Sequence, residues 1–255
     1  MLATVWCWYL MEATTIYVLV VIFVATLIRS AFGFGEALIA VPLLAIRLPV
    51  NVAAPLAVLV SITVAAAIIV QDWQSIHVRS AGWLVTSTLF GIPLGLLLLT
   101  QGNPRLVKGV LAVIIVAFSA YALIGCKPPE LRSDSRTWLA VCGFFAGVLG
   151  GAYGMNGPPL AIYGAMRRWS AQHFRATLQG YFLPASLIGM AGYWLAGLWV
   201  HEVTRYYLLS LPLALPAVLL GRTVNRGLRG DAFLKFVHVG LVLIGATLLV
   251  EAGRG

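Results

Sequence analysis

The stretch GGAYGMNGPP at residues 150–159 decides the fold that this sequence predicts. It lies inside a run from Thr137 to Met166 that contains no charged residue. A straight helix over that run would be about 45 Å long, which exceeds the roughly 30 Å hydrocarbon core of a bilayer. Because glycines loosen a helix and prolines interrupt its hydrogen bonds, we expect a break here. A new helix should start after it, with Asn156 as its cap and Pro158 or Pro159 in its first turn.

A similar interruption lies near the start of the chain. One apolar run ends near Ile28, RSAFGFGE follows at 29–36, and residues 37–46 are apolar again. Other segments of the second half match segments of the first half in the same order. The sequence distance between matching segments rises from about 121 to about 127 residues. Such repeats are common in secondary transporters. The pattern predicts two homologous transmembrane repeats, 1–126 and 137–255, joined by a linker loop at 127–136; chance similarity between Leu- and Ala-rich helices is the alternative.

The composition indicates a membrane protein. Of 255 residues, 61% are hydrophobic and 10% are charged, against about 25% charged in an ordinary soluble domain. Continuous apolar runs also exclude an outer-membrane barrel, whose strands alternate. We therefore expect an all-α polytopic membrane protein of about eight transmembrane helices, in two four-helix halves, with the first helix of each half broken. The halves would be parallel repeats with four crossings each, and inverted if the first segment adds a crossing.

Charge placement predicts the location of the protein. The net charge of +9 comes from 17 Lys and Arg against 8 Asp and Glu, and the basic residues lie almost entirely in short loops. This distribution is typical of a multi-pass protein of the cell inner membrane and not of a nucleic-acid partner. With eight spans, ten Lys and Arg fall on the side of the odd-numbered loops and six on the other. This bias favours termini outside the cytoplasm.

Broken helices in a membrane favour an anion site, because the positive ends of two half-helices can face one ligand. Arg175 and Gln179 share a helix face and could hold a sulfonate or carboxylate, although Arg175 could equally extend to the lipid headgroups. The predicted substrate-binding residues are Gly33, Phe34, Gly35, Glu36, Ala37, Tyr153, Asn156, Gly157, Pro158, Arg175 and Gln179. Close helix packing is the alternative use of small residues, and we assign it to Gly91, Gly95, Gly143 and Gly147.

Glu36 is the one acidic residue inside an apolar segment. Burying an ionised carboxylate in hydrocarbon is costly, so the side chain should carry a proton or have a partner. Arg29, seven positions earlier, and Arg175 are the candidate partners. Two interpretations stay open: Glu36 couples transport to protons, or Glu36 and an arginine form a structural pair.

The motifs GFGEALIAVPLL at 33–44 and GGAYGMNGPPLAIYGA at 150–165 resemble the paired glycine-rich motifs of the sulfite exporter TauE/SafE family, and HFRATLQGYF at 173–182 adds to the resemblance. It implies a secondary transporter of a small anion, such as sulfite or an organosulfonate. This sequence departs from the family at Glu36, where many relatives carry glycine.

A proton or ion gradient would drive such transport. An intramembrane enzyme and a non-transporting scaffold are the alternatives, but we find no nucleophile, base or metal constellation and expect no cofactor. The expected partners are the small anion and the lipid bilayer, and a homo-oligomer is left open.

Overall fold

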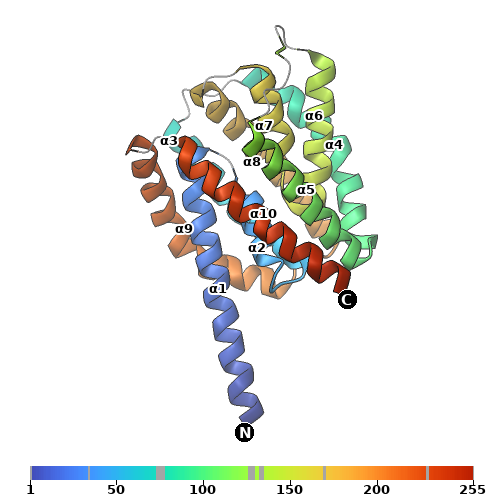
Figure 1. Ribbon diagram of the computed structural model, residues 1–255, viewed down its shortest axis with the longest axis vertical. Coiled ribbons are helices and arrows are strands. Elements are labelled where there is room, and N and C mark those ends of the chain that lie inside the picture. Colours follow the sequence, from blue (N-terminus) through green and yellow to red (C-terminus); the bar gives the residue numbers. More distant parts are fainter. Residues whose placement is uncertain are drawn as a thin grey trace.

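The computed structural model describes residues 2–33, 35–72, 78–125, 130–131, 135–168, 171–227 and 230–254. All regular structure over these residues is helical, and Figure 1 shows how the helices pack side by side. The helices are α1 (Leu2–Phe32), α2 (Glu36–Leu44), α3 (Val50–Asp72), α4 (Val78–Gln101), α5 (Pro104–Ile124), α6 (Arg136–Tyr153), α7 (Gly157–Met166), α8 (Ala171–Leu195), α9 (His201–Gly227) and α10 (Gly230–Arg254).

The described helices are those of a membrane protein. Five of them contain stretches of 19 to 21 residues that are long and apolar enough to cross a bilayer, in α1, α3, α4, α5 and α9. Large apolar side chains such as Phe90, Leu106 and Leu219 are exposed on the outside of the bundle. An exposed apolar surface of this extent fits contact with lipid.

The uncharged run of the second half breaks where the sequence predicts it. Helix α6 ends at Tyr153, and Gly154 takes a left-handed conformation with φ of 67°. The N–H of Gly154 donates to the Gly150 carbonyl at 2.9 Å, and the N–H of Met155 donates to the Leu149 carbonyl at 3.2 Å. These bonds satisfy the carbonyls at the end of α6.

The expected side-chain cap of α7 is wrong. Asn156 occupies the N-cap position, but its side chain makes no capping hydrogen bond and its backbone is already helical. The amide is instead used in a tertiary contact described below. The proline prediction is correct, because Pro158 stands in the first turn of α7.

At each break the chain folds back on itself, so that the two pieces do not continue in one direction as a single interrupted span would. The Leu131 N–H, just before α6, donates to the carbonyl of Met166 at the end of α7, at 2.9 Å. Likewise, the Tyr17 hydroxyl of α1 donates to the carbonyl of Leu43 near the end of α2, at 2.6 Å. Each pair is therefore an antiparallel hairpin with a long first arm and a short second arm.

The tip of the first hairpin depends on two glycines. Gly33 and Gly35 have φ angles of 85° and 98°, a region that costs other residues about 1–2 kcal/mol. Two left-handed residues so close together turn the chain sharply, which is the physical reason for the reversal between α1 and α2.

The long helices pack closely in specific pairs: α4 with α6, α1 with α9, α5 with α10 and α3 with α8. At the α4–α6 contact, a Cβ added to Gly91, Gly95 or Gly147 would overlap backbone atoms of the facing helix. A Cβ on Gly143 would meet Ser87 and Leu84. Glycines allow such a backbone approach, so the packing assignment of these four glycines is confirmed.

Substituting the glycines of the two hairpin tips should destabilise the protein unequally. Gly35→Ala should cost about 1–2 kcal/mol, because the positive φ is strained although no heavy atom lies within 4 Å of the new Cβ. Gly154→Ala has the same strain, and its Cβ would also lie 2.8 Å from Val58 Cγ2, which should add about 1–3 kcal/mol. Thermal unfolding in detergent should rank wild type above Gly35→Ala and Gly35→Ala above Gly154→Ala. Equal melting temperatures for the two variants would contradict this account of the tips.

Candidate functional site

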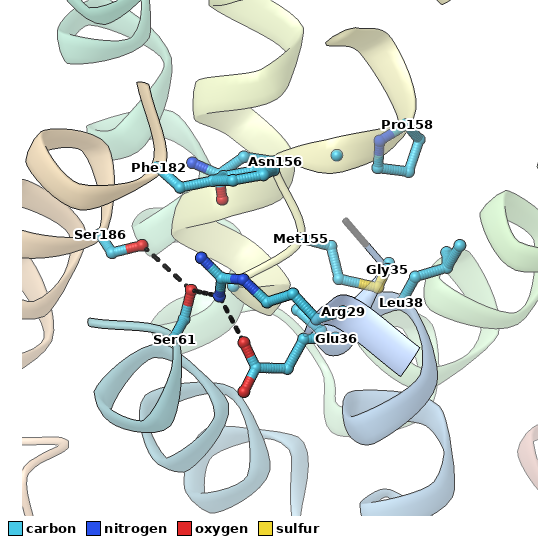
Figure 2. A pocket seen from close by; sticks show the side chains of 13 residues that line it. Arg29, Gly35, Glu36, Leu38, Ser61, Met155, Asn156, Pro158, Phe182 and Ser186 are labelled. Carbon is cyan, nitrogen blue, oxygen red and sulfur yellow. Dashed lines mark hydrogen bonds and ion pairs between the residues drawn. The ribbon is translucent and has the colours of Figure 1, made fainter. Parts of the chain in front are cut away.

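The tips of the two hairpins line one cavity (Figure 2). Its free volume is about 30 Å³, enough for about two water-sized spheres. The lining residues are Arg29, Gly35, Glu36, Ala37, Leu38, Ser61, Gly154, Met155, Asn156, Gly157, Pro158, Phe182 and Ser186. They come from α1, α2, α3, α7, α8 and the two breaks, so the cavity includes residues of both halves of the chain.

Arg29 is the central cation of this cavity, and its side chain is only 3% exposed. Its Nη1 donates to the Glu36 carboxylate and, at 2.5 Å, to Ser61 Oγ. Its Nε and Nη2 are buried and have no hydrogen-bond partner. Since Nε carries one N–H and Nη2 carries two, three of the five guanidinium donors are unused. A buried charged donor without an acceptor is costly, and these groups therefore have unmet hydrogen-bonding capacity that an acceptor could satisfy.

Phe182 supports the guanidinium from the side. The Arg29 guanidinium carbon lies 5.1 Å from the centroid of the Phe182 ring, which is within the range of a cation–π contact. The ring fixes the plane of the guanidinium without consuming any of its N–H donors. The three unused donors of Arg29, a residue that lines the cavity, therefore stay without a partner next to the ring.

Glu36 neutralises Arg29 from the first turn of α2, and its side chain is also only 3% exposed. Its Oε2 accepts from Arg29, and its Oε1 accepts from Thr26 Oγ1 at 3.4 Å. Ser61 Oγ continues the chain of contacts to Ser186 Oγ, at 3.5 Å. Figure 2 shows this line of polar groups from Glu36 through Arg29 to the two serines. It connects α1, α2, α3 and α8.

Asn156 faces the same cavity from the second hairpin and is 7% exposed. Its Nδ2 donates to the Tyr181 hydroxyl at 3.3 Å. That hydroxyl is 2.7 Å from Thr88 Oγ1, which donates to the Gly143 carbonyl at 2.9 Å. This buried series of hydrogen bonds fixes the amide of Asn156.

Two further tyrosines fasten the end of α6. The Tyr193 hydroxyl donates to the Gly150 carbonyl at 2.9 Å. The Tyr153 hydroxyl donates to the Val107 carbonyl of α5, also at 2.9 Å. Both side chains are fully buried. The second hairpin tip is thus held by neutral hydrogen bonds from several helices.

The first turns of α2 and α7 both line the cavity. First-turn N–H groups have no acceptor within their own helix and carry partial positive charge. Helix α2 supplies the N–H groups of Ala37 and Leu38. Helix α7 supplies fewer donors than an ordinary helix start, because Pro158 and Pro159 have no N–H. Of its first three residues, only Gly157 contributes one.

The structure brings together only part of the predicted site. Six predicted residues line the cavity, namely Gly35, Glu36, Ala37, Asn156, Gly157 and Pro158. Gly33 and Tyr153 are not among the described residues that line it. Phe34 lies outside the described residues, as do the side chains of Arg175 and Gln179 on α8.

Sequence reasoning missed Ser61, Phe182 and Ser186 as parts of the site, and it treated Arg29 only as a counter-ion. A single hydroxyl in an apolar helix is a weak signal, since it is as common in helix packing. Within the described part of the chain, no three His, Cys, Asp or Glu side chains are grouped so that they could hold a metal ion.

Comparison with known proteins gives one family. The model of the sulfite exporter TauE/SafE family matches residues 18–248. No curated protein and no solved structure matches the chain significantly. Because the family match includes both helix breaks and nearly the whole chain, this protein belongs to the sulfite exporter TauE/SafE family of membrane transporters for sulfur-containing anions.

Proposed function

We propose that this protein is a secondary carrier that binds a small anion in the cavity between the two hairpin tips. Sulfite or an organosulfonate is the preferred substrate, and a proton or ion gradient drives transport. The observation that carries the proposal is the buried Arg29 side chain, which lines the cavity and has three N–H donors without a partner. An anion would supply the acceptors that the protein itself does not provide.

The chemistry of the cavity matches a small oxyanion. A guanidinium presents a planar fork that binds two oxygens of one anion at once. Asn156 contributes a polar amide, and the starts of α2 and α7 contribute partial positive charge. Because the cavity is small, we expect a compact head group such as sulfite or sulfonate to fit better than a long carboxylate.

Arg175 and Gln179 are proposed to lie on the approach to this cavity. Residues 175, 179, 182 and 186 are spaced by four, three and four positions, which places them along one face of helix α8. Two of them, Phe182 and Ser186, line the cavity. The other two lie nearer the start of α8, where they would attract an anion before it reaches Arg29.

The chain is proposed to consist of two inverted repeats, 1–126 and 137–255, with 127–136 as their linker. The packing supports this arrangement, because α4 packs on α6 as α9 packs on α1, while α3 meets α8 and α5 meets α10. Each half has five helices, α1–α5 and α6–α10, of which the second is short. Because each helix reverses the direction of the chain, an odd number of helices in the first half makes the second half start at the opposite end of the bundle.

The termini are proposed to lie outside the cytoplasm, in a bacterial-type inner membrane. Figure 1 shows both ends of the chain at the lower end of the bundle. Arg167, Arg168, Arg222 and Arg226 follow α7 or end α9, at the opposite end of the bundle. Basic residues prefer the cytoplasmic side. An oligomer is left open.

An isosteric charge change at Asn156 tests the location of the site. Asn156→Asp keeps the size of the side chain, replaces the Nδ2 donor to the Tyr181 hydroxyl by an oxygen to which that hydroxyl can turn and donate, and adds a negative charge to the cavity. Uptake of labelled sulfite and methanesulfonate into liposomes should therefore fall at least about tenfold. The matched control is Asn103→Asp, the same change at the exposed N-cap of α5, which should transport normally. Normal uptake by Asn156→Asp would place the anion site elsewhere, and failure of the wild type to move any of these anions would overturn the proposed function.

A further inference from the structure

We propose that Glu36 is a tethered competitor of the substrate for Arg29, and that one proton therefore enters with each anion. This inference rests on the proposed function and extends it by naming the coupling ion and its stoichiometry. The geometric basis is that Glu36 already occupies one side of the Arg29 guanidinium, at Nη1, inside the substrate cavity. In the empty carrier the Glu36 carboxylate accepts a hydrogen bond from Arg29, as an oxygen of the substrate would.

Because of charge balance, Arg29 cannot pair with the Glu36 carboxylate and with a substrate anion at the same time. Arg29 and Glu36 together are neutral, and both side chains are buried. A monoanion on the unused donors of Arg29 would put two negative charges beside one positive charge in a poorly hydrated cavity. Such an unbalanced buried charge is strongly unfavourable. If Glu36 takes up a proton, the anion replaces it as the partner of Arg29 and the site stays neutral.

Among the described side chains around Glu36, no further charge besides Arg29 could replace the proton. Ser61 from α3, Phe182 and Ser186 from α8, and Asn156 from the second break are all neutral. Helices α5 and α10 also pack against α2. On α5, Lys108 and Arg105 line two other pockets and are not among the described residues that line this cavity. On α10, the side chains of Asp231, Lys235, His238, Glu251 and Arg254 lie outside the described residues. Among the described side chains, Glu36 forms an ion pair with Arg29 alone.

The exchange is balanced in protons and charge. The Glu36 carboxylate takes a proton from water on the loading side and becomes a neutral acid, while the anion oxygens bind the Arg29 N–H groups. Thr26 Oγ1, 3.4 Å from Oε1, can stay in contact, because a hydroxyl both donates and accepts. On the other side the anion leaves, the proton returns to water, and Glu36 pairs with Arg29 again. One monoanion and one proton cross together, so no net charge moves.

The proton count in wild-type protein is the first test. Methanesulfonate is the preferred probe, because it stays a monoanion over the whole useful pH range and any proton must come from the carrier. Labelled uptake and the internal pH are measured on the same liposomes. We expect one proton per anion and no effect of an imposed voltage; if only sulfite moves, the count is compared between wild type and Glu36→Gln. Anion uptake without a proton overturns this inference and leaves the proposed function intact.

Glu36→Gln is the second test, and its expected effect is selective. Net uptake driven by a pH gradient should fall at least about tenfold, because Gln cannot carry the proton. Exchange of labelled for unlabelled anion should fall far less than net uptake, because an anion stays paired with Arg29 and no proton needs to be released. Glu202→Gln, the same change in the exposed first turn of α9, should behave as wild type. If Glu36→Gln keeps pH-driven uptake, the inference is wrong; if the variant does not fold, the wild-type proton count decides alone.

Discussion

Replacing Arg29 with glutamine should abolish anion transport and also lower stability. The substitution removes the guanidinium N–H groups from the cavity and leaves Glu36 buried without its ion-pair partner. Loss of charge-assisted hydrogen bonds to an anion should reduce uptake by at least about 100-fold. Breaking a buried pair by removing one partner should cost about 3–5 kcal/mol of folding free energy. Liposome uptake and thermal unfolding of the same preparation measure the two effects.

A double variant separates these two consequences. Arg29→Gln with Glu36→Gln removes both charges, so the melting temperature should return most of the way toward wild type. Transport should stay lost, because the cavity still lacks a cation. Arg29→Lys keeps the charge but not the planar fork, so we expect stability near wild type with weaker anion binding. Transport by the double variant at the wild-type rate would show that Arg29 is structural only.

Gly95→Leu should prevent formation of the folded protein. The α4–α6 contact brings two backbones together, and a Cβ at residue 95 would overlap the backbone carbonyl of Val148. Backbone atoms cannot rotate away as a side chain can, so the helices must separate, at a cost of at least about 3 kcal/mol. Fluorescence-detected size-exclusion chromatography in detergent should show aggregate in place of a sharp peak.

The control for this prediction lies on the same helix. Gly82 also belongs to α4, but an added Cβ there has no heavy atom within 4 Å. Gly82→Leu should give a peak like that of wild type. A sharp peak for Gly95→Leu, at wild-type height, would mean that the α4–α6 contact is looser than the structure has it.

The helix breaks could be predicted from the sequence, whereas the direction of the chain after each break could not. Glycine and proline act locally, so GFGE and MNGPP show where hydrogen bonding stops. Whether α7 continues across the membrane or returns depends on the conformation of single residues, such as the left-handed Gly154, and on partners distant in sequence. A helix that crosses and a helix that returns have the same apolar composition, so composition does not distinguish them.

The site was predictable to the extent that it depends on burial of charge. Glu36 is visible in the sequence because a carboxylate in an apolar segment is rare and costly. The role of Arg29 was not visible, because it depends on how many of its N–H groups the protein leaves unused. That number depends on Glu36 and Ser61, which both accept from Nη1 alone. Ser61 belongs to another helix, and it does not differ in type from an ordinary packing residue.

The two hairpin tips are fastened by different kinds of contact, and this difference has a mechanical consequence. The tip between α6 and α7 is held by neutral hydroxyl contacts from Tyr153, Tyr181 and Tyr193, which neither a proton nor an anion removes. The tip between α1 and α2 is closed by the ion pair of Arg29 with Glu36, and Arg29 also donates to Ser61 of α3. Binding of a proton and an anion would break the contact between Arg29 and Glu36 at the α1–α2 tip, whereas the tyrosine contacts at the α6–α7 tip would remain. Helix α2 would then be the single moving gate, swinging against a fixed α6–α7 wall, and access would alternate by the motion of one short helix.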